Sequence, residues 1–291
     1  MTRPSPNPSS LSSRLVRAGQ RGAVWLAGMA LLAACSTTET VSPPRQSGGP
    51  DARNQAPLPR SGTTSSEETR RRASIRLELS ANHFQQGSTP LALQEADEAV
   101  RIDPSYGPAY GMLGLIHMRI GDQPKAEESF RRALRLDPND AELNNNYGWF
   151  LCQTGRQREA LQYFNNALQD RLYATPSRPL HNAGICLMQI GDESGAETYL
   201  LRSYQADPGG PVALYNLSQL YLRRGNVERA RYFSDRLMSA YQPTAQTLWL
   251  ATRVARASGD NDGAARLGRQ LRSQFPESRE AGLLQRGTFS E

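Results

Sequence analysis

Residues 108–138 read PAYGMLGLIHMRIGDQPKAEESFRRALRLDP, and this stretch predicts two helices joined by a tight turn. Apolar or small residues recur at helical spacing on both sides of Gly121, where the periodicity breaks, and the second series ends at Pro138. The two stripes hold Tyr110, Leu113, Gly114 and His117, then Ala126, Phe130, Ala133 and Leu134. One such pair cannot bury its apolar faces alone, so we expect it to pack against similar units.

The same pattern returns along the chain at a nearly constant period. Its turn glycines are Gly87, Gly121, Gly155, Gly191, Gly225 and Gly259, with spacings of 34, 34, 36, 34 and 34 residues. Five residues after each glycine stands an alanine, at Ala92, Ala126, Ala160, Ala196, Ala230 and Ala264. A proline follows 17 residues after four of them, at Pro104, Pro138, Pro208 and Pro276, and Pro243 lies one place late. Three columns in agreement predict a repeat architecture.

Each column has a physical cause. Glycine tolerates the positive φ that often follows a helix end, alanine lets two helices cross closely, and proline stops a helix. A 34-residue helix-turn-helix unit with these columns resembles the tetratricopeptide repeat (TPR), over roughly residues 70 to 280. The resemblance implies an all-α fold, a right-handed superhelical solenoid of about six repeats whose first helices line a groove. The last repeat departs from the pattern at Gly268 and Leu271.

The N-terminal segment predicts a targeting signal followed by a linker. Arginines precede a short apolar run over residues 23–34, as in a secretory signal peptide, and the run ends in LAAC at Cys35. This ending resembles a bacterial lipobox, whose cysteine is acylated and becomes the new N-terminus. Ser36, in place of an aspartate, implies sorting to the outer membrane with the protein facing the periplasm.

These features predict four parts of the chain. Residues 1–34 are expected to be a cleaved signal peptide, and residues 35–66 a lipid-anchored disordered linker, because they contain few apolar residues. The TPR domain is expected over 67–280 and a C-terminal tail over 281–291.

Charge and composition argue against several classes of function. The net charge of +6 arises before residue 73, because the remaining sequence holds 24 basic and 24 acidic residues. A neutral body argues against a nucleic-acid partner. His83 and His117 share one repeat position, which favours packing, and neither the histidines nor the cysteines show metal-ligand spacing. We expect no cofactor, no metal and no small-molecule substrate.

Catalysis has one weak candidate, a hydrolase site in the insertion before the fourth repeat. The cluster comprises Tyr173, Ser177, Arg178 and His181 and lacks an evident acid to orient the histidine. The asparagines at 146, 182 and 216 share one repeat position, nine residues before the turn glycine, which favours helix packing. We therefore expect a binding protein and not an enzyme.

The groove-facing positions follow from the repeat register. They are expected to be Leu77, Phe84, Leu115, Met118, Arg119, Asn145, Trp149, Gln153, Arg178, His181, Ile185, Met188, Gln189, Tyr215, Gln219 and Leu222. This mixture suits an extended or helical peptide better than a carboxylate, because the Lys and Asn clamp of some chaperone-binding TPR proteins has no counterpart. Trp149 is the expected anchor.

Cys152 and Cys186 lie on consecutive first helices, which should pack side by side. Two interpretations remain open, a disulfide that clamps the third and fourth repeats or two buried reduced thiols. An oxidising compartment favours the disulfide.

Two stretches of the sequence resemble a particular family of TPR proteins. Residues 141–161, AELNNNYGWFLCQTGRQREAL, and residues 171–192, RLYATPSRPLHNAGICLMQIGD, resemble the PilF/PilW family of type IV pilus biogenesis lipoproteins, the pilotins of the pilus secretin. The resemblance implies an outer-membrane lipoprotein that brings the secretin to that membrane and promotes its multimerisation. The alternative is a general periplasmic TPR adaptor for other cell-envelope assembly or peptidoglycan machinery.

Overall fold

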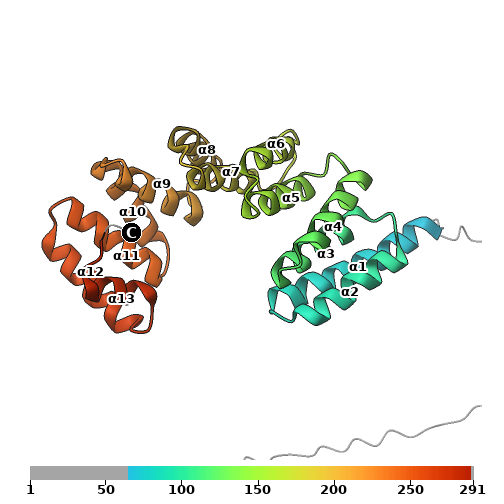
Figure 1. Cartoon of the computed structure of the whole chain (residues 1–291), viewed down its shortest axis with the longest axis horizontal. Coiled ribbons are helices and arrows are strands. Elements are labelled where there is room, and N and C mark those ends of the chain that lie inside the picture. The colour runs from blue at the N-terminus through green and yellow to red at the C-terminus, as the bar shows by residue number, and fades with distance from the viewer. Residues whose placement is uncertain (1–64, 290–291) are drawn as a thin grey trace, which may run out of the picture. The chain divides into compact units, whose positions relative to one another are not determined.

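The computed structural model describes residues 65–289, and every regular element in this range is an α-helix (Figure 1). The thirteen helices of the described range are α1 Ser65–Gln85, α2 Thr89–Ile102, α3 Gly107–Ile120, α4 Gln123–Leu136, α5 Ala141–Gln153, α6 Gln157–Ala167, α7 Ser177–Gln189, α8 Glu193–Ala206, α9 Pro211–Arg223, α10 Val227–Ala240, α11 Ala245–Ala257, α12 Asn261–Gln274 and α13 Arg279–Arg286. None of them combines the length and the hydropathy needed to cross a membrane. The predicted signal peptide, Cys35 and almost all of the predicted linker lie outside the described residues.

The helices pack as hairpins in two layers. Each odd-numbered helix from α1 to α11 packs against the even-numbered helix that follows it, which gives six hairpins. Each odd-numbered helix also packs closely against the next odd-numbered one, whereas the even-numbered helices of the described range meet one another only through long side chains, such as Tyr204 of α8 and Tyr232 of α10. The odd-numbered helices therefore form a continuous row, which we call the inner layer. This arrangement confirms the predicted all-α TPR solenoid of six repeats.

The predicted turn glycines close the hairpins. All six adopt a positive φ, between 71° and 86°. At Gly121 the backbone N–H groups of Gly121 and Asp122 donate to Met118 and His117 carbonyls at the end of α3. The Asp122 carboxylate then accepts from the Lys125 backbone N–H at 3.2 Å and caps α4. One short segment thus ends one helix and starts the next.

A further column of small residues explains how closely the two helices of a hairpin approach. Seven residues before the turn glycines stand Ser80, Gly114, Gly148, Gly184, Ser218 and Thr252. A Cβ added at Gly114 would lie 2.6 Å from the Phe130 ring, and one at Gly184 would lie 2.6 Å from Leu200. The Ser80 and Ser218 hydroxyls instead donate to the carbonyls of Ala92 and Ala230, at 2.7 and 2.9 Å.

The last repeat is complete and carries an additional helix. A Cβ at Gly268 would lie 3.1 Å from a Leu284 methyl group, so this glycine lets α13 approach α12. Helix α13 contacts both α11 and α12. The structure therefore differs from the expected C-terminal tail over 281–291, because the amphipathic segment of α13 buries Ala281 and Leu283 against the last repeat.

The one irregular connection lies between the third and fourth repeats. Helix α6 ends at Ala167 and α7 begins at Ser177, so a longer loop joins them. The Tyr173 hydroxyl in this loop donates to the Glu142 carboxylate on α5 at 2.7 Å. The insertion is thereby held against the preceding repeat.

Candidate peptide-binding surface

Three positions of each inner-layer helix form a stripe along its surface, at ten, six and three residues before the turn glycine. We call these positions the groove columns; their spacing of four and three residues places them on one helical face. In the second to fifth repeats, the columns hold Gly111, Leu115 and Met118, then Asn145, Trp149 and Cys152, then His181, Ile185 and Met188, then Tyr215, Gln219 and Leu222. Most of these side chains are half-buried, as a peptide-binding surface requires.

The apolar members are anchored on the core and keep part of their surface exposed. Trp149 and Met118 pack against a buried cluster that contains Phe130, Phe150 and Phe164. Met188, Tyr215 and Leu222 pack against the next cluster along the chain, and Leu115 bridges two clusters. The fold already fixes the inner atoms of these side chains. The apolar row that they form therefore loses little conformational entropy when it binds a peptide.

One residue that was expected to face the groove, Asn145, is buried instead. Asn145 is only 1% exposed. Its amide oxygen accepts a hydrogen bond of 2.9 Å from Asn182 on α7, and its amide nitrogen donates to Asn146 at 3.3 Å. Its amide is used to join two repeats, because a buried amide needs partners. The packing interpretation of Asn182 agrees with this contact, although its partner is Asn145 and not Asn146.

The two arginines among the expected groove residues contact neighbouring repeats. The Arg119 guanidinium lies 3.4 Å from the Phe84 ring centroid, and its Nη1 donates to the Phe84 carbonyl at 2.6 Å. Arg178 donates to both carboxylate oxygens of Glu142, at 2.9 and 3.0 Å. Both arginines and the expected groove residues Gln153 and Gln189 are solvent-exposed. They can offer charge or hydrogen bonds at the rim of an apolar row.

The insertion cluster has structural contacts in place of a catalytic arrangement. Among the described residues, no hydrogen bond joins Ser177 to His181, and the Ser177 carbonyl instead accepts from the Ser203 hydroxyl at 3.0 Å. Burial, reinforced by the nearby Arg178 charge, lowers the pKa of His181 to about 4, so the imidazole is neutral at pH 7. The described residues also contain no group of three metal-ligating side chains. His181 is thus a half-buried, uncharged member of the groove columns.

The two cysteines lie on the inner-layer helices of the third and fourth repeats, and Cys152 itself belongs to a groove column. The structure joins Cys152 of α5 to Cys186 of α7 by a disulfide, with their Cα atoms 5.7 Å apart. Both side chains are at most 1% exposed. The bond fixes two neighbouring inner-layer helices beside Trp149.

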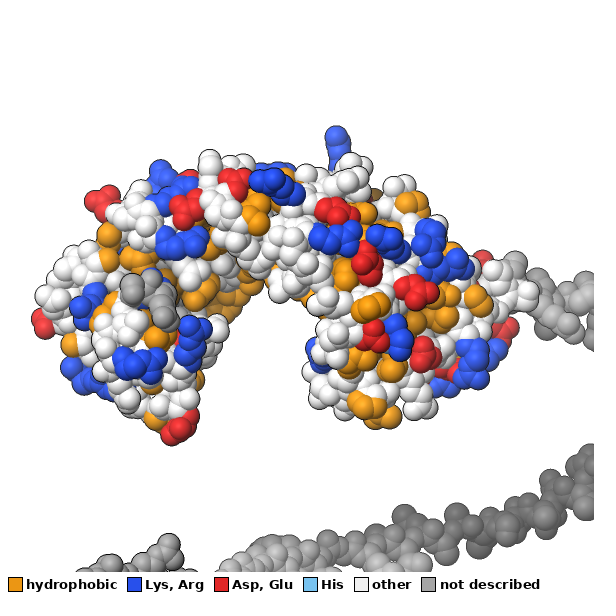
Figure 2. Space-filling view, viewed as in Figure 1, with side chains coloured by type: hydrophobic (Ala, Val, Ile, Leu, Met, Phe, Trp, Pro, Cys, Tyr) orange, Lys and Arg blue, Asp and Glu red, His pale blue; other side chains and the backbone are white. Residues whose placement is uncertain are grey.

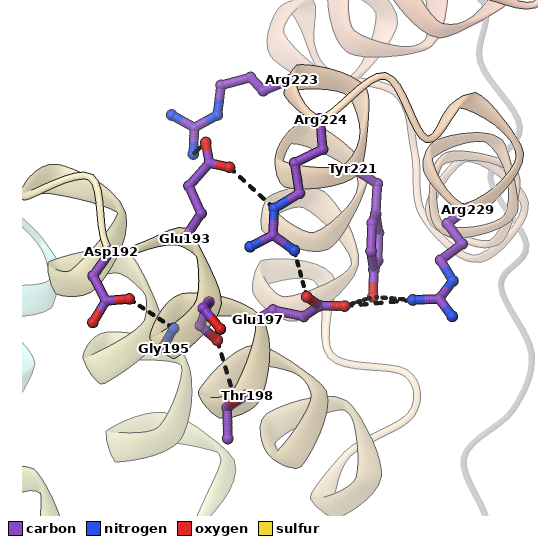
Figure 3. Close-up of polar contacts among 10 residues, drawn as sticks. Asp192, Glu193, Gly195, Glu197, Thr198, Tyr221, Arg223, Arg224 and Arg229 are labelled. Carbon is purple, nitrogen blue, oxygen red and sulfur yellow. Dashed lines mark hydrogen bonds and ion pairs between the residues drawn. The ribbon is translucent and has the colours of Figure 1, made fainter.

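Carboxylates on the even-numbered helices bind the next repeat. Glu197 of α8 accepts a hydrogen bond of 2.6 Å from the Tyr221 hydroxyl and forms ion pairs with Arg224 and Arg229 (Figure 3). The Tyr221 hydrogen bond, more than the arginines, holds the pKa of Glu197 below its ordinary value. Glu127, at the same repeat position, likewise accepts from the hydroxyl of Tyr147 and pairs with an arginine of the next repeat.

Opposite charges therefore neutralise one another on the helical surface. Figure 2 shows basic and acidic side chains interspersed over the face in view. The groove columns of the second to fifth repeats contain no charged residue, in contrast to this surface.

The predicted groove positions end at the fifth repeat, whereas the same columns continue onto α11 of the sixth. Counting ten, six and three residues back from Gly259 gives Trp249, Arg253 and Arg256 on α11, and these residues contact Phe289 from the C-terminal segment. The column rule could have found them. The contact with Phe289 has no signal in the repeat register.

The hairpins, their columns and the continuous inner layer define a TPR protein. The family model described as "Tetratricopeptide repeat" matches residues 74–242. The chain is also 31% identical over 204 residues to the type IV pilus assembly protein PilF of Pseudomonas aeruginosa. This match covers 70% of this chain and 81% of that protein.

Two solved structures are similar over most of the helical region. The crystal structure of PilW, described as a widely conserved type IV pilus biogenesis factor, is 33% identical with a TM-score of 0.68, and the match covers 73% of this chain and 97% of PilW. The structure of Pseudomonas aeruginosa PilF is 29% identical with a TM-score of 0.68, and the match covers 77% of this chain and all of that one. The chain belongs to the PilF/PilW family of type IV pilus biogenesis TPR proteins.

Proposed function

We propose that this protein is a pilotin, an outer-membrane lipoprotein that binds the type IV pilus secretin and promotes its outer-membrane localisation and multimerisation. The observation that carries the proposal is the similarity to PilF and PilW, over 81% of the PilF protein and at least 97% of the two solved chains. The protein would act as a scaffold without catalysis, since its candidate residues form a binding surface.

The groove columns supply the proposed contact with the secretin. Trp149, Ile185 and Met188 lie on the third and fourth repeats, which the disulfide and the hydrogen bond between Asn145 and Asn182 hold together. A prearranged apolar row loses little conformational freedom when it binds a peptide. A secretin segment with apolar side chains at intervals would fit it, and the exposed Arg119, Gln153, Arg178 and Gln189 would contact its polar groups.

The anchoring role rests on the sequence. Cys35 follows the lipobox-like LAA, and about thirty residues separate it from α1. Acyl chains on this cysteine would hold the protein at the periplasmic face of the outer membrane, because two or more chains give lasting attachment. The linker composition would leave the TPR domain free to reach a secretin subunit before the ring closes.

A Cys35→Ala strain tests the anchoring. We expect secretin multimers to be lost from the outer-membrane fraction while the unanchored protein keeps its helical fold by circular dichroism. A Cys35→Ala strain with a normal amount of secretin multimer in that fraction would overturn the proposal. Capture of other envelope proteins without secretin would instead favour a general adaptor.

A further inference from the structure

The C-terminal segment lies on the inner-layer face of the last repeat. The Phe289 ring stacks on Trp249 of α11, with centroids 5.1 Å apart and planes 27° apart. The Arg256 guanidinium carbon lies 3.7 Å from the centroid of the same ring. Arg253 Nε donates to the Phe289 carbonyl at 3.0 Å. One phenylalanine is thus held through its ring and its backbone at once.

The three residues that hold Phe289 are the groove columns of the sixth repeat. Trp249, Arg253 and Arg256 stand ten, six and three residues before Gly259. In the fifth repeat the same columns hold Tyr215, Gln219 and Leu222. Phe289 therefore occupies, on α11, the position that a bound peptide would occupy on the other inner-layer helices.

Three arginines line the surface beside Phe289. A cavity of about 320 Å³ is lined by Phe289 and by Arg256, Arg269 and Arg272, and no acidic residue from the described part of the chain lines it. Four other cavities on the described helices each combine arginines with at least one carboxylate. Arginines that converge beside an aromatic site favour a carboxylate in the ligand.

We propose that this face of α11 is a second peptide-binding site, that it takes an aromatic residue flanked by a carboxylate, and that the chain's own C-terminal segment occupies it in competition with such a partner. Trp249 and Arg256 contact the aromatic ring, and Arg253 donates a hydrogen bond to the backbone carbonyl. Arg269 and Arg272 face the carboxylate of the partner. The site does not depend on which protein the third and fourth repeats bind.

A shortened chain that ends at Gly287 exposes the site. The probe is a fluorescein-labelled peptide of residues 286–291, RGTFSE, and its binding is followed by fluorescence anisotropy. We expect the shortened chain to bind it at least about tenfold more tightly than the full chain, because a tethered segment competes at high effective concentration. Replacing the peptide phenylalanine by alanine, or Arg256→Ala in the shortened chain, should weaken binding about tenfold.

Arg266→Ala is the matched control, because this exposed arginine of α12 does not line the cavity. Equal affinity of the shortened and full chains for the peptide, or binding that survives Arg256→Ala, would overturn the proposal. If the shortened chain unfolds, Phe289→Ala in the full chain replaces it. Unfolding of both variants would mean that the segment is a structural cap, and that result also overturns the proposal.

Discussion

The amide of Asn182 on α7 donates a hydrogen bond of 2.9 Å to the amide oxygen of Asn145 on α5, across the junction between the third and fourth repeats. Both side chains belong to consecutive inner-layer helices, and Asn145 is only 1% exposed. A repeat protein is stabilised largely by contacts between neighbouring repeats. This buried polar contact therefore contributes to one specific junction.

Asn145→Ala should lower the free energy of unfolding by about 1–3 kcal/mol, because it leaves the buried Asn146 and the half-buried Asn182 without their amide partner. Urea denaturation followed by circular dichroism measures the change. The matched control is Asn216→Ala, since within the described residues the Asn216 amide bonds only to the Val212 carbonyl of its own helix. Equal losses of unfolding free energy in the two variants would show that the contact between the repeats adds no stability of its own.

Reduction of the Cys152–Cys186 disulfide should lower the melting temperature. The bond closes a loop across a sequence separation of 34 residues, and loop closure of that size constrains the unfolded chain by about 4 kcal/mol. We expect a decrease of more than about 5 °C in calorimetry with reductant. The double variant Cys152→Ser with Cys186→Ser should melt low with or without reductant. Alkylation of both cysteines in the unreduced protein would contradict the disulfide.

Gly114→Ala should destabilise the second repeat by about 1–3 kcal/mol, because the added methyl group would lie 2.6 Å from the Phe130 ring in a packed core. Gly282→Ala on α13 is the comparison, since its new methyl group would meet only the flexible end of Arg286 at 3.3 Å. Its higher helix propensity should leave stability unchanged or raise it by up to about 1 kcal/mol. A Gly114→Ala protein as stable as the parent would disprove the close-crossing explanation of the small-residue column.

The Glu197 network should make stability depend on pH in a defined direction. The folded protein lowers the pKa of Glu197 below its ordinary 4.5, chiefly through the Tyr221 hydrogen bond. The stabilisation is therefore complete above about pH 4.5 and is lost as the pH falls through the lower folded-state pKa. The difference in unfolding free energy between the parent and Glu197→Gln should be largest at pH 7 and shrink below pH 4.5. If this difference in unfolding free energy grew as the pH fell, the pH dependence would have the opposite sign, and the Glu197 network could not be its cause.

The sequence was sufficient for the fold because each repeat column has its own physical constraint. Gly121 must take a positive φ and Ala126 must fit a helix crossing, so the hairpins could be placed by counting residues. The groove was harder to predict, since Asn145 shares its column with the half-buried His181 and Tyr215 but is itself buried and bonded to Asn182 on the next inner-layer helix. The docking of Phe289 depends on contacts between distant segments and leaves no trace in the local pattern.

The most direct test of the central claim is recovery of the secretin from solubilised membranes by the tagged protein, with and without Trp149→Ala. Trp149 lies at the centre of the groove columns, half-buried on the core. Tyr232→Ala is the matched control, because this aromatic residue is 50% exposed on the even-numbered helix α10. The proposal predicts that Trp149→Ala recovers at least about tenfold less secretin, as expected for a hot-spot residue, while Tyr232→Ala recovers the normal amount. Undiminished secretin recovery by a folded Trp149→Ala protein would contradict it.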